Sequence, residues 1–330
     1  MEVLAEPFTC RRYLDSDKEN IMKLWQEESG WGAITLQQFD KWFINTPFGK
    51  CIIVIATNAN HEVTGQIIFS PTEMLVDGKI IKSLRGSAPI IRSDYRERNL
   101  RTTDHPAFTL IKRGFEIAAE DGYQLVYSFP SYGWLGLLRT FPKVLPNFSE
   151  SASFECFAIL LEATQTFSLD NNYEVNILTS FTQEYEQLWE EAVVKIPLKC
   201  SIVRTPKLLK YILGGHLVLE TRNTADKSLV GYLAVNKKTG LIVDLFAGSE
   251  KDLKKVLCHS INFLQDEKFK NIHNNFTQLK GMLTSTLVPV LKDINYSKDN
   301  YRFAFSSYLL DNAIPISKIQ ESQWYMTPMG

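Results

Sequence analysis

The residues with the clearest chemical potential in this sequence are four arginines within one short stretch. Arg92, Arg96, Arg98 and Arg101 lie close together along the chain. A guanidinium group binds phosphate through paired, charge-assisted hydrogen bonds, so such a cluster is typical of an anion site. The same stretch contains three carboxylates, which could instead pair with the arginines on a solvated loop: Asp94, Glu97 and Asp104. Both interpretations stay open at this point.

The arginine stretch lies between a predicted strand, Arg85–Ile91, and a predicted helix, Pro106–Asp121. The helix has apolar residues at helical spacing, and Gly122 follows it as a C-terminal cap. Tyr123–Phe129 is an apolar run that predicts the next strand. A strand–helix–strand order predicts a crossover between parallel strands, so these two strands are expected to be parallel.

Further elements are predicted in the first half of the chain. Asp15 or Asp17 can cap a helix that ends near Ser29, and Asp77-Gly78 is typical of a type I′ hairpin turn. The remaining elements are the helices Thr35–Asn45 and Leu135–Thr140 and the strands Thr9–Tyr13, Cys51–Thr57, Val63–Ser70, Met74–Val76, Ile80–Leu84 and Phe154–Leu161.

The second half repeats this order in outline. Its predicted helices are Thr182–Val194, Thr205–Leu213, Ser249–Asp266 and Leu287–Asn295, and its predicted strands are His216–Thr221, Leu229–Val235, Leu241–Phe246, Asn271–Thr277 and Arg302–Leu309. We therefore predict an α/β (α+β) fold of two domains, 1–162 and 176–330, each a mixed, mostly antiparallel sheet with flanking helices. The polar residues 163–175 are predicted to be a linker, and a length of 330 residues suits two domains.

Composition excludes several classes of protein. The 36 basic and 37 acidic side chains give a net charge of −1, which does not favour a nucleic-acid partner. The five cysteines form no C-x-x-C pair and the five histidines are scattered, so we predict no metal site. No signal peptide and no apolar run long enough for a membrane span is recognised, so we expect a cytoplasmic protein without a membrane partner. The sequence does not define the oligomeric state.

Three stretches of the first half resemble the GNAT family, the Gcn5-related N-acetyltransferases. They are Lys41–Gly49 (KWFINTPFG), Ile90–Arg101 (IIRSDYRERNLR) and Ser128–Ser131 (SFPS). The second half resembles the trailing GNAT-like domain of two-domain members by the order of its elements. The resemblance implies two tandem GNAT-like domains and a co-substrate that is acetyl-CoA or another acyl-CoA.

In this family the strand before the loop pairs with the pantetheine amides, and the loop and the next helix hold the pyrophosphate. This chain has Asn99 and Arg101 where the family's loop has glycines, and Asp104 where a carboxylate would cap the helix. Arginine side chains are therefore expected to replace backbone contacts to phosphate. The resemblance assigns coenzyme A binding to Ile90, Ile91, Arg92, Arg96, Arg98, Asn99 and Arg101.

The resemblance also locates the catalytic positions. Many family members protonate the leaving thiolate with a tyrosine, and the corresponding position here is Leu138. Ser131 and Tyr132 are the candidate catalytic residues, with Tyr132 as the substitute acid and Tyr127 nearby; packing at a turn is the other interpretation of Tyr132. The tryptophans Trp25, Trp31 and Trp42 fall where the family shapes its acceptor pocket, although packing alone would explain them. Candidate general bases, among which the sequence does not choose, are Glu28, Glu73 and Asp94.

Three functions are compatible with the sequence. The first is an acyl-CoA-dependent N-acyltransferase that acetylates the amine of a small molecule. The second is a non-catalytic GNAT-fold binding module, which the loss of both loop glycines and of the tyrosine favours. The third is an aminoacyl transferase of the FemAB kind, which also pairs two GNAT-like halves; the balanced charge does not favour a tRNA-facing surface.

Overall fold

The computed structural model describes residues 9–96, 103, 105–130, 134–149, 152–161, 167, 170–196, 200–266, 276–284, 286–314 and 325. The chain divides into two compact units. The first unit consists of Met1–Met74, Ile80–Ala152 and Ala304–Ser317, and the second of Leu75–Lys79, Ser153–Phe303 and Lys318–Gly330. In the described part of the chain, no helix combines the length and apolar character that crossing a bilayer requires.

The first unit contains a mixed sheet in the order β1-β2-β3-β4-β5-β13. Antiparallel pairs join β1 to β2, β2 to β3 and β13 to β5, whereas β4 and β5 are parallel, as the crossover rule predicted. The strands are β1 Thr9–Arg12, β2 Ile52–Thr57, β3 Val63–Val76, β4 Lys79–Ile91, β5 Leu125–Ser128 and β13 Ser297–Leu309.

The central hairpin is longer than the sequence indicates. The runs predicted as four separate strands join into β3 and β4, because backbone pairing continues through the polar positions between them. Asp77 and Gly78 both have positive φ angles, 49° and 79°, as a type I′ turn requires.

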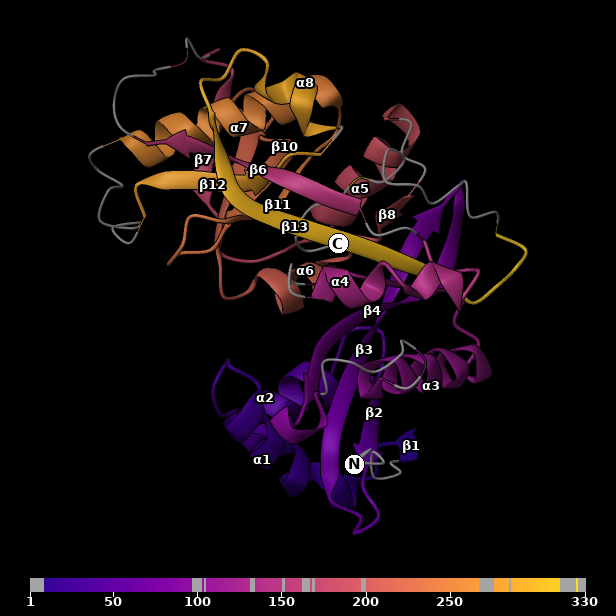
Figure 1. Cartoon of the computed structure of the whole chain (residues 1–330). Helices are drawn as coiled ribbons and strands as arrows, with labels where there is room; N and C mark the ends of the chain where they lie inside the picture. Colours follow the sequence, from indigo (N-terminus) through magenta and orange to yellow (C-terminus); the bar gives the residue numbers. More distant parts are fainter. Residues whose placement is uncertain are drawn as a thin grey trace. The chain divides into compact units, whose positions relative to one another are not determined.

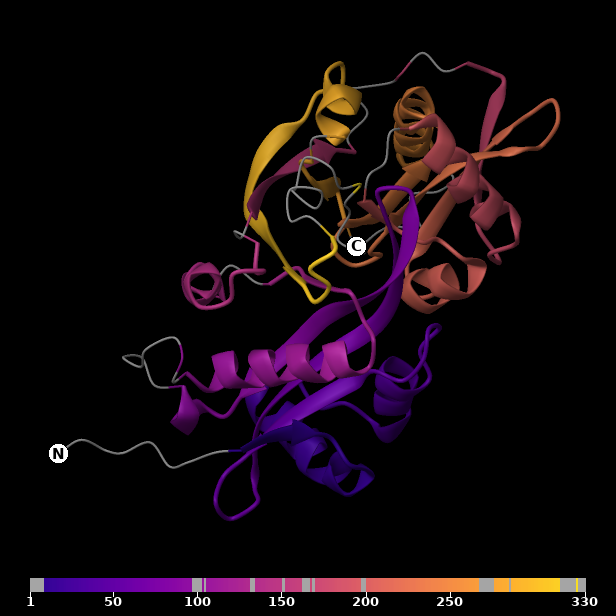
Figure 2. The ribbon, with the colours of Figure 1, turned by 90° about the vertical axis from the view of Figure 1, so that its right-hand side faces the viewer.

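Helices cover both faces of this sheet (Figure 1). On one face, α1 (Lys18–Glu28), α2 (Leu36–Phe39) and the π-helical turn η2 (Asp40–Ile44) pack on β2 and β3. On the other face, α3 (Pro106–Glu120) packs on β2, β3 and β5, and Figure 2 shows it lying across these strands. Strand alternation explains the division: Ile53 and Ile55 face the first cluster, and Ile52 and Val54 face the second.

Short segments follow β5 and complete the α3 side of the first unit. They are α4 (Leu135–Leu138) and the 3₁₀ turn η6 (Phe141–Lys143). Phe141 and Phe148 are buried there against the α3 cluster, and their ring centroids lie 5.1 Å apart.

The second unit has its own antiparallel sheet in the order β11-β10-β9-β7. Its strands are β7 Tyr173–Ile177, β9 Leu217–Asn223, β10 Leu229–Val235 and β11 Ile242–Ala247, with the short β8 at Cys200–Ile202. Its helices are α5 Glu184–Lys195, α6 Pro206–Leu213, α7 Glu250–Gln265 and α8 Leu287–Leu291. A further antiparallel pair joins β6 (Ala152–Leu160) to β12 (Gln278–Met282).

One prediction about the second half needs correction at its boundary. The predicted linker 163–175 already contains the start of β7, because Tyr173 pairs with Asn223 of β9. The stretch Thr277–Thr286 contains β12. Gly281 serves close packing there, since a Cβ at this position would lie 2.4 Å from the ring of its strand partner Phe157. The predicted strand Asn271–Thr277 lies mainly outside the described residues.

Strand β13 is also longer than predicted, and its last part belongs to the first unit. Ser306–Leu309 pair with Leu125–Ser128 of β5. The C-terminal part of the sequence therefore supplies a strand to the sheet that the N-terminal part begins.

Candidate functional site

Strands β4 and β5 separate at one end of their shared register. The parallel pairing covers Ser83–Gly86 against Leu125–Ser128, and β4 then continues to Ile91 beside β3 without a register partner on β5. Two features end the pairing. Ala88 has a φ of 46°, which diverts the backbone of β4, and prolines at 89 and 130 remove backbone N–H donors from both sides.

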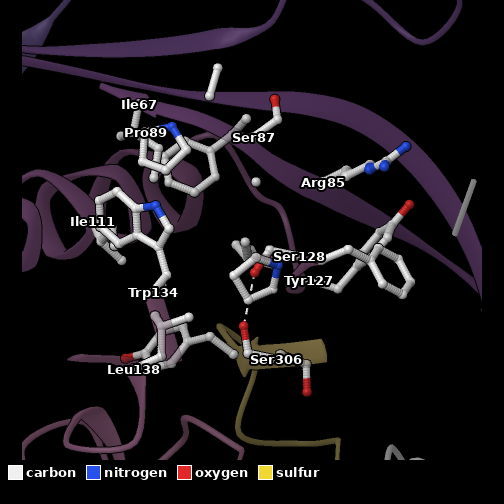
Figure 3. A pocket seen from close by; sticks show the side chains of 18 of the residues that line it. Ile67, Arg85, Ser87, Pro89, Ile111, Tyr127, Ser128, Trp134, Leu138 and Ser306 are labelled. Atoms are coloured by element: carbon white, nitrogen blue, oxygen red, sulfur yellow. Dashed lines mark hydrogen bonds between the residues drawn. The ribbon is translucent and has the colours of Figure 1, made fainter. Parts of the chain in front are cut away.

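A cavity of about 190 Å³ opens where the two strands separate, and all the residues that line it belong to the first unit (Figure 3). Its wall on the α3 side is apolar, with Phe69, Ile111, Phe115, Leu138 and Phe148. Trp134 also lies on this side, and β13 contributes Ser306, Ser307 and Tyr308.

The cavity is lined from both faces of the sheet. Trp31, which follows α1, contributes from the opposite face to α3 and is 64 % exposed. Arg85 and Tyr127 are register partners and alternate with Leu84 and Val126, which face α3. The Arg85 guanidinium carbon lies 5.8 Å from the ring centroid of Phe129. The cavity therefore has lining residues on both faces of the sheet.

Few polar side chains line this cavity. Ser128 and Ser306 join β5 to β13 through a hydrogen bond of 2.8 Å between their hydroxyl oxygens, drawn in Figure 3. The Ser307 hydroxyl donates to that of Ser149 at 3.0 Å, and the Ser87 hydroxyl donates to the Ile68 carbonyl at 3.5 Å. None of the described lining residues is a carboxylate.

The sequence matches no family model and no curated protein. Solved structures do match. A GCN5-related N-acetyltransferase from Anabaena variabilis aligns with 92 % of this chain and 73 % of its own, with a TM-score of 0.65 and 11 % identity. A probable N-acyltransferase from Enterococcus faecalis aligns with 90 % of this chain and 72 % of its own, with a TM-score of 0.63 and 11 % identity.

Yeast N-myristoyltransferase, solved with bound myristoyl-CoA, is also similar. It aligns with 93 % of this chain and 80 % of its own, at 10 % identity and a TM-score of 0.58. The chain has the GNAT fold. This confirms the fold class that the sequence predicted, and the separated β4 and β5 strands are the part of the GNAT fold where the cavity lies.

The first arginine of the predicted GNAT loop is paired with protein carboxylates. The Arg92 side chain donates to both oxygens of Asp94 and lies 3.5 Å from a carboxylate oxygen of Glu62. These hydrogen bonds lower the pKa of Asp94 below its usual range. The backbone N–H of Arg92 donates to the Thr64 carbonyl of β3 at 2.8 Å, so this group already has a strand partner.

The second arginine fastens the end of β4 to α1. Arg96 donates through Nε to the Ile91 carbonyl at 2.6 Å and through Nη2 to a carboxylate oxygen of Glu28 at 3.0 Å. Ser93 donates to the other oxygen of Glu28 at 3.0 Å. A ligand that bound Arg96 or the Ile91 carbonyl would replace these contacts. Ile90 is buried against the α1 side and Ile91 against the α3 side.

The start of α3 carries its own cap. His105, rather than Asp104, occupies the cap position, and its Nδ1 accepts a hydrogen bond of 3.1 Å from the Ala107 N–H. Phe108 and Thr109 donate to the His105 carbonyl, and Pro106 has no N–H. The imidazole reaches this position because the residue before a proline is held in extended conformation, which turns its side chain over the first turn. Asp104 lies outside the described residues.

The structure describes some of the predicted catalytic positions and not others. Leu138, which replaces the tyrosine of many GNAT enzymes, is buried and lines the cavity, and so does Tyr127. Ser131, Tyr132, Arg98, Asn99 and Arg101 lie outside the described residues, so their roles stay predictions.

The three candidate bases do not line the cavity. Glu28 and Asp94 are bonded to the arginines described above, and Glu73 lies on β3. Among the three tryptophans, Trp31 lines the cavity, while Trp25 is buried in the α1 cluster. Groups of side chains that could hold a metal ion are absent from the described part of the chain.

The residues of β13 are those that sequence reasoning missed. Ser306, Ser307 and Tyr308 lie about 180 residues from β5 along the chain, so no local motif links them to the cavity. Their only sequence signal is the apolar run that predicted a strand at Arg302–Leu309.

Proposed function

We propose that this protein is an acyl-CoA-dependent N-acyltransferase that acts on the amine of a small molecule. The observation that carries the proposal is the cavity at the point where β4 and β5 separate, lined from both faces of the sheet. The fold supports it, because the similar structures from Anabaena variabilis and yeast are an N-acetyltransferase and an N-myristoyltransferase.

The two-sided lining suits direct transfer. The acyl-CoA would lie on the α3 side, with its pantetheine arm along the unpaired part of β4, and the amine would approach from the side of Trp31. The neutral amine nitrogen attacks the thioester carbonyl carbon and gives up a proton to solvent, the carbon–sulfur bond breaks, and the thiolate leaves and takes a proton from solvent or a nearby hydroxyl. The site would hold the amine and the thioester side by side between β4 and β5. This fixed orientation turns a bimolecular attack into an effectively unimolecular step.

The polar groups at the gap have limited roles in this scheme. The hydroxyls of Ser128 and Ser306 share one hydrogen bond, so one of the two keeps a hydrogen that it can donate to the thioester or the departing sulfur. Leu138 cannot supply a proton, so the reaction would depend on Tyr132, on Tyr127 or on water. Because a thiol has a pKa of about 8.5, water can protonate the leaving thiolate at neutral pH without a dedicated acid.

A second function is favoured by the arginine contacts. Arg92 and Arg96 are engaged by Asp94 and Glu28, and His105 caps α3, so these three groups already have partners within the protein. A non-catalytic GNAT-fold binding module would require none of these groups to contact phosphate. It would bind a ligand in the cavity without turning it over.

One titration followed by one assay separates these functions. Free CoA and acyl-CoA should raise the melting temperature, by the equivalent of about 2.7 kcal/mol at a hundredfold excess over Kd, whereas ADP alone should act weakly. Release of free thiol in the presence of an amine panel then measures turnover. Binding without thiol release from any amine would favour the binding module, and no response to CoA or acyl-CoA would contradict the proposed transferase.

A further inference from the structure

The inner part of the cavity is built from the aromatic core of the first unit. Phe69, Phe115, Phe148 and Tyr308 line it and are packed on one another. The rings of Phe115 and Tyr308 are stacked, with centroids 4.2 Å apart and planes 8° from parallel. Phe115 also contacts Phe69 at 6.0 Å between centroids. These rings form a firm wall, because a packed core resists displacement of its side chains.

This lining suits hydrocarbon rather than the pantetheine arm. The arm carries two amides, and burying an amide without a hydrogen-bond partner costs several kcal/mol. The hydroxyls of Ser128 and Ser306 line the cavity and are bonded to each other, as Figure 3 shows. The pantetheine amides would find their partners on the β4 backbone at Ser87 and Ala88, which line the cavity where β4 diverges from β5, so the inner part is left for the acyl chain.

The size of the cavity limits that chain. An apolar cavity of about 150 Å³ holds benzene, which has six carbons. The whole cavity here, including its part along Ser87–Pro89, is about 190 Å³, so it sets an upper limit slightly above that size for an enclosed acyl group. An acetyl group would leave most of this apolar wall without contacts, and a fourteen-carbon chain would extend beyond the cavity.

We propose that the acyl group this protein carries is an apolar chain or ring of about six to eight carbons. The inference rests on the proposed function and specifies its donor. It places the donor between the acetyl group transferred by one class of similar structure and the myristoyl group bound by the other.

The test is the affinity of the full-length protein for a series of acyl-CoAs without acceptor, measured by calorimetry. The series runs from free CoA through acetyl-, butyryl-, hexanoyl-, octanoyl- and dodecanoyl-CoA to myristoyl-CoA. Each buried methylene should tighten binding about fourfold, so hexanoyl-CoA should bind on the order of a hundredfold more tightly than acetyl-CoA. Affinity should fall again at dodecanoyl- and myristoyl-CoA. Equal affinity for acetyl- and hexanoyl-CoA, or a continued rise to myristoyl-CoA, overturns the inference.

Substitutions of Leu138 test the position of the chain. Leu138 lies on α4 and lines the cavity, as Figure 3 shows. Leu138→Trp should fill the space and move the preferred chain toward acetyl, with the affinity for free CoA retained. Leu138→Ala should move it toward longer chains, and it provides a second measurement if the larger side chain impairs folding. The matched control is Leu137→Trp, a neighbour on α4 that is packed against the same cluster without lining the cavity.

The outcomes distinguish this inference from the proposed function. If neither CoA nor any acyl-CoA binds, both fail. If acetyl-CoA binds and is turned over while longer chains add no affinity, the transferase stands and the chain-length inference fails. Loss of free CoA binding in Leu138→Trp, with Leu137→Trp unaffected, would place the pantetheine arm in the inner cavity and overturn the inference.

Discussion

At the residue scale, the cavity depends on one glycine of α3. A Cβ built at Gly114 would lie 2.2 Å from Cε2 and 2.6 Å from Cζ of Phe69, well inside contact distance. The absence of a side chain at 114 therefore lets Phe69 lie flat between β3 and α3, where its ring forms part of the cavity wall.

We expect Gly114→Ala to destabilise the protein by about 1–3 kcal/mol, the usual cost of overpacking a core. The displaced Phe69 ring should also weaken acyl-CoA binding. Urea unfolding and the acyl-CoA titration measure the two effects. The control is Gly136→Ala on α4, where an added Cβ meets no atom within 4 Å, so stability should be unchanged or slightly higher. Equal effects of the two substitutions would contradict this account.

Trp31 offers a second test at the residue scale, because it is an exposed side chain that lines the cavity on the side from which we propose the amine approaches. Trp31→Ala should raise the KM for the amine several-fold and leave the affinity for CoA nearly unchanged. Steady-state kinetics in which the amine and the acyl-CoA are each varied separates the effect on the KM for the amine from the effect on CoA affinity. Trp42→Ala is the matched control, since Trp42 is a half-exposed indole of the same helical region outside the cavity. A loss of CoA affinity in Trp31→Ala would argue against a two-sided site.

At the scale of elements, the start of α3 differs from the family pattern. His105 accepts from Ala107 with a neutral imidazole nitrogen, and burial lowers the pKa of His105 from its ordinary value. An anion that bound this helix end would have to displace the imidazole from the Ala107 N–H. The N-terminal end of α3, where the helix dipole is positive, is thus capped by a side chain of the protein itself.

This cap predicts a dependence of stability on pH. As the pH falls, the unfolded chain protonates His105 before the folded protein does, because the folded pKa is the lower one. The contribution of the cap is therefore complete above about pH 6.5 and is lost as the pH falls through the folded pKa. His105→Asn keeps a capping oxygen that does not titrate, so it should match the wild type near pH 7.5 and exceed it at pH 5. The free energies of unfolding of the two proteins, measured with urea, could instead change in parallel across this pH range. That result would exclude a stabilising role for the His105 cap.

At the scale of the whole molecule, the first unit is not continuous in sequence. Ala304–Ser317 belong to it, and β13 supplies the partner of β5 together with the Tyr308 ring stacked on Phe115. The cavity wall is therefore shared between residues from both ends of the chain.

A fragment of residues 1–162 tests this arrangement. It should fold poorly, because it lacks the strand that covers the edge of β5 and leaves the rings of Phe115 and Phe148 exposed. Near-ultraviolet circular dichroism and gel filtration report its packing and its aggregation. Addition of a peptide spanning 300–314 should restore cooperative unfolding, whereas a scrambled peptide should not. A fragment that unfolds cooperatively without the peptide would show that β13 is dispensable for the first unit.

The sequence by itself determined the order of elements and much of the local chemistry. Apolar periodicity located α3, Asp77-Gly78 fixed the hairpin turn, and the strand–helix–strand order predicted parallel β4 and β5. It also placed Leu138 at the position of the missing acid, and that residue does line the cavity. These features follow from interactions between residues near one another in the chain, which the local pattern records.

Only the tertiary structure decided which distant groups meet. The pairing of β13 with β5, the Ser128–Ser306 hydrogen bond and the Arg96–Glu28 contact join residues far apart in sequence. The alternating pattern of a strand is satisfied by any partner with a matching face, so it does not specify the neighbour. The same holds for the loop arginines, whose charges fit a phosphate or a carboxylate equally well until the fold places a carboxylate within reach.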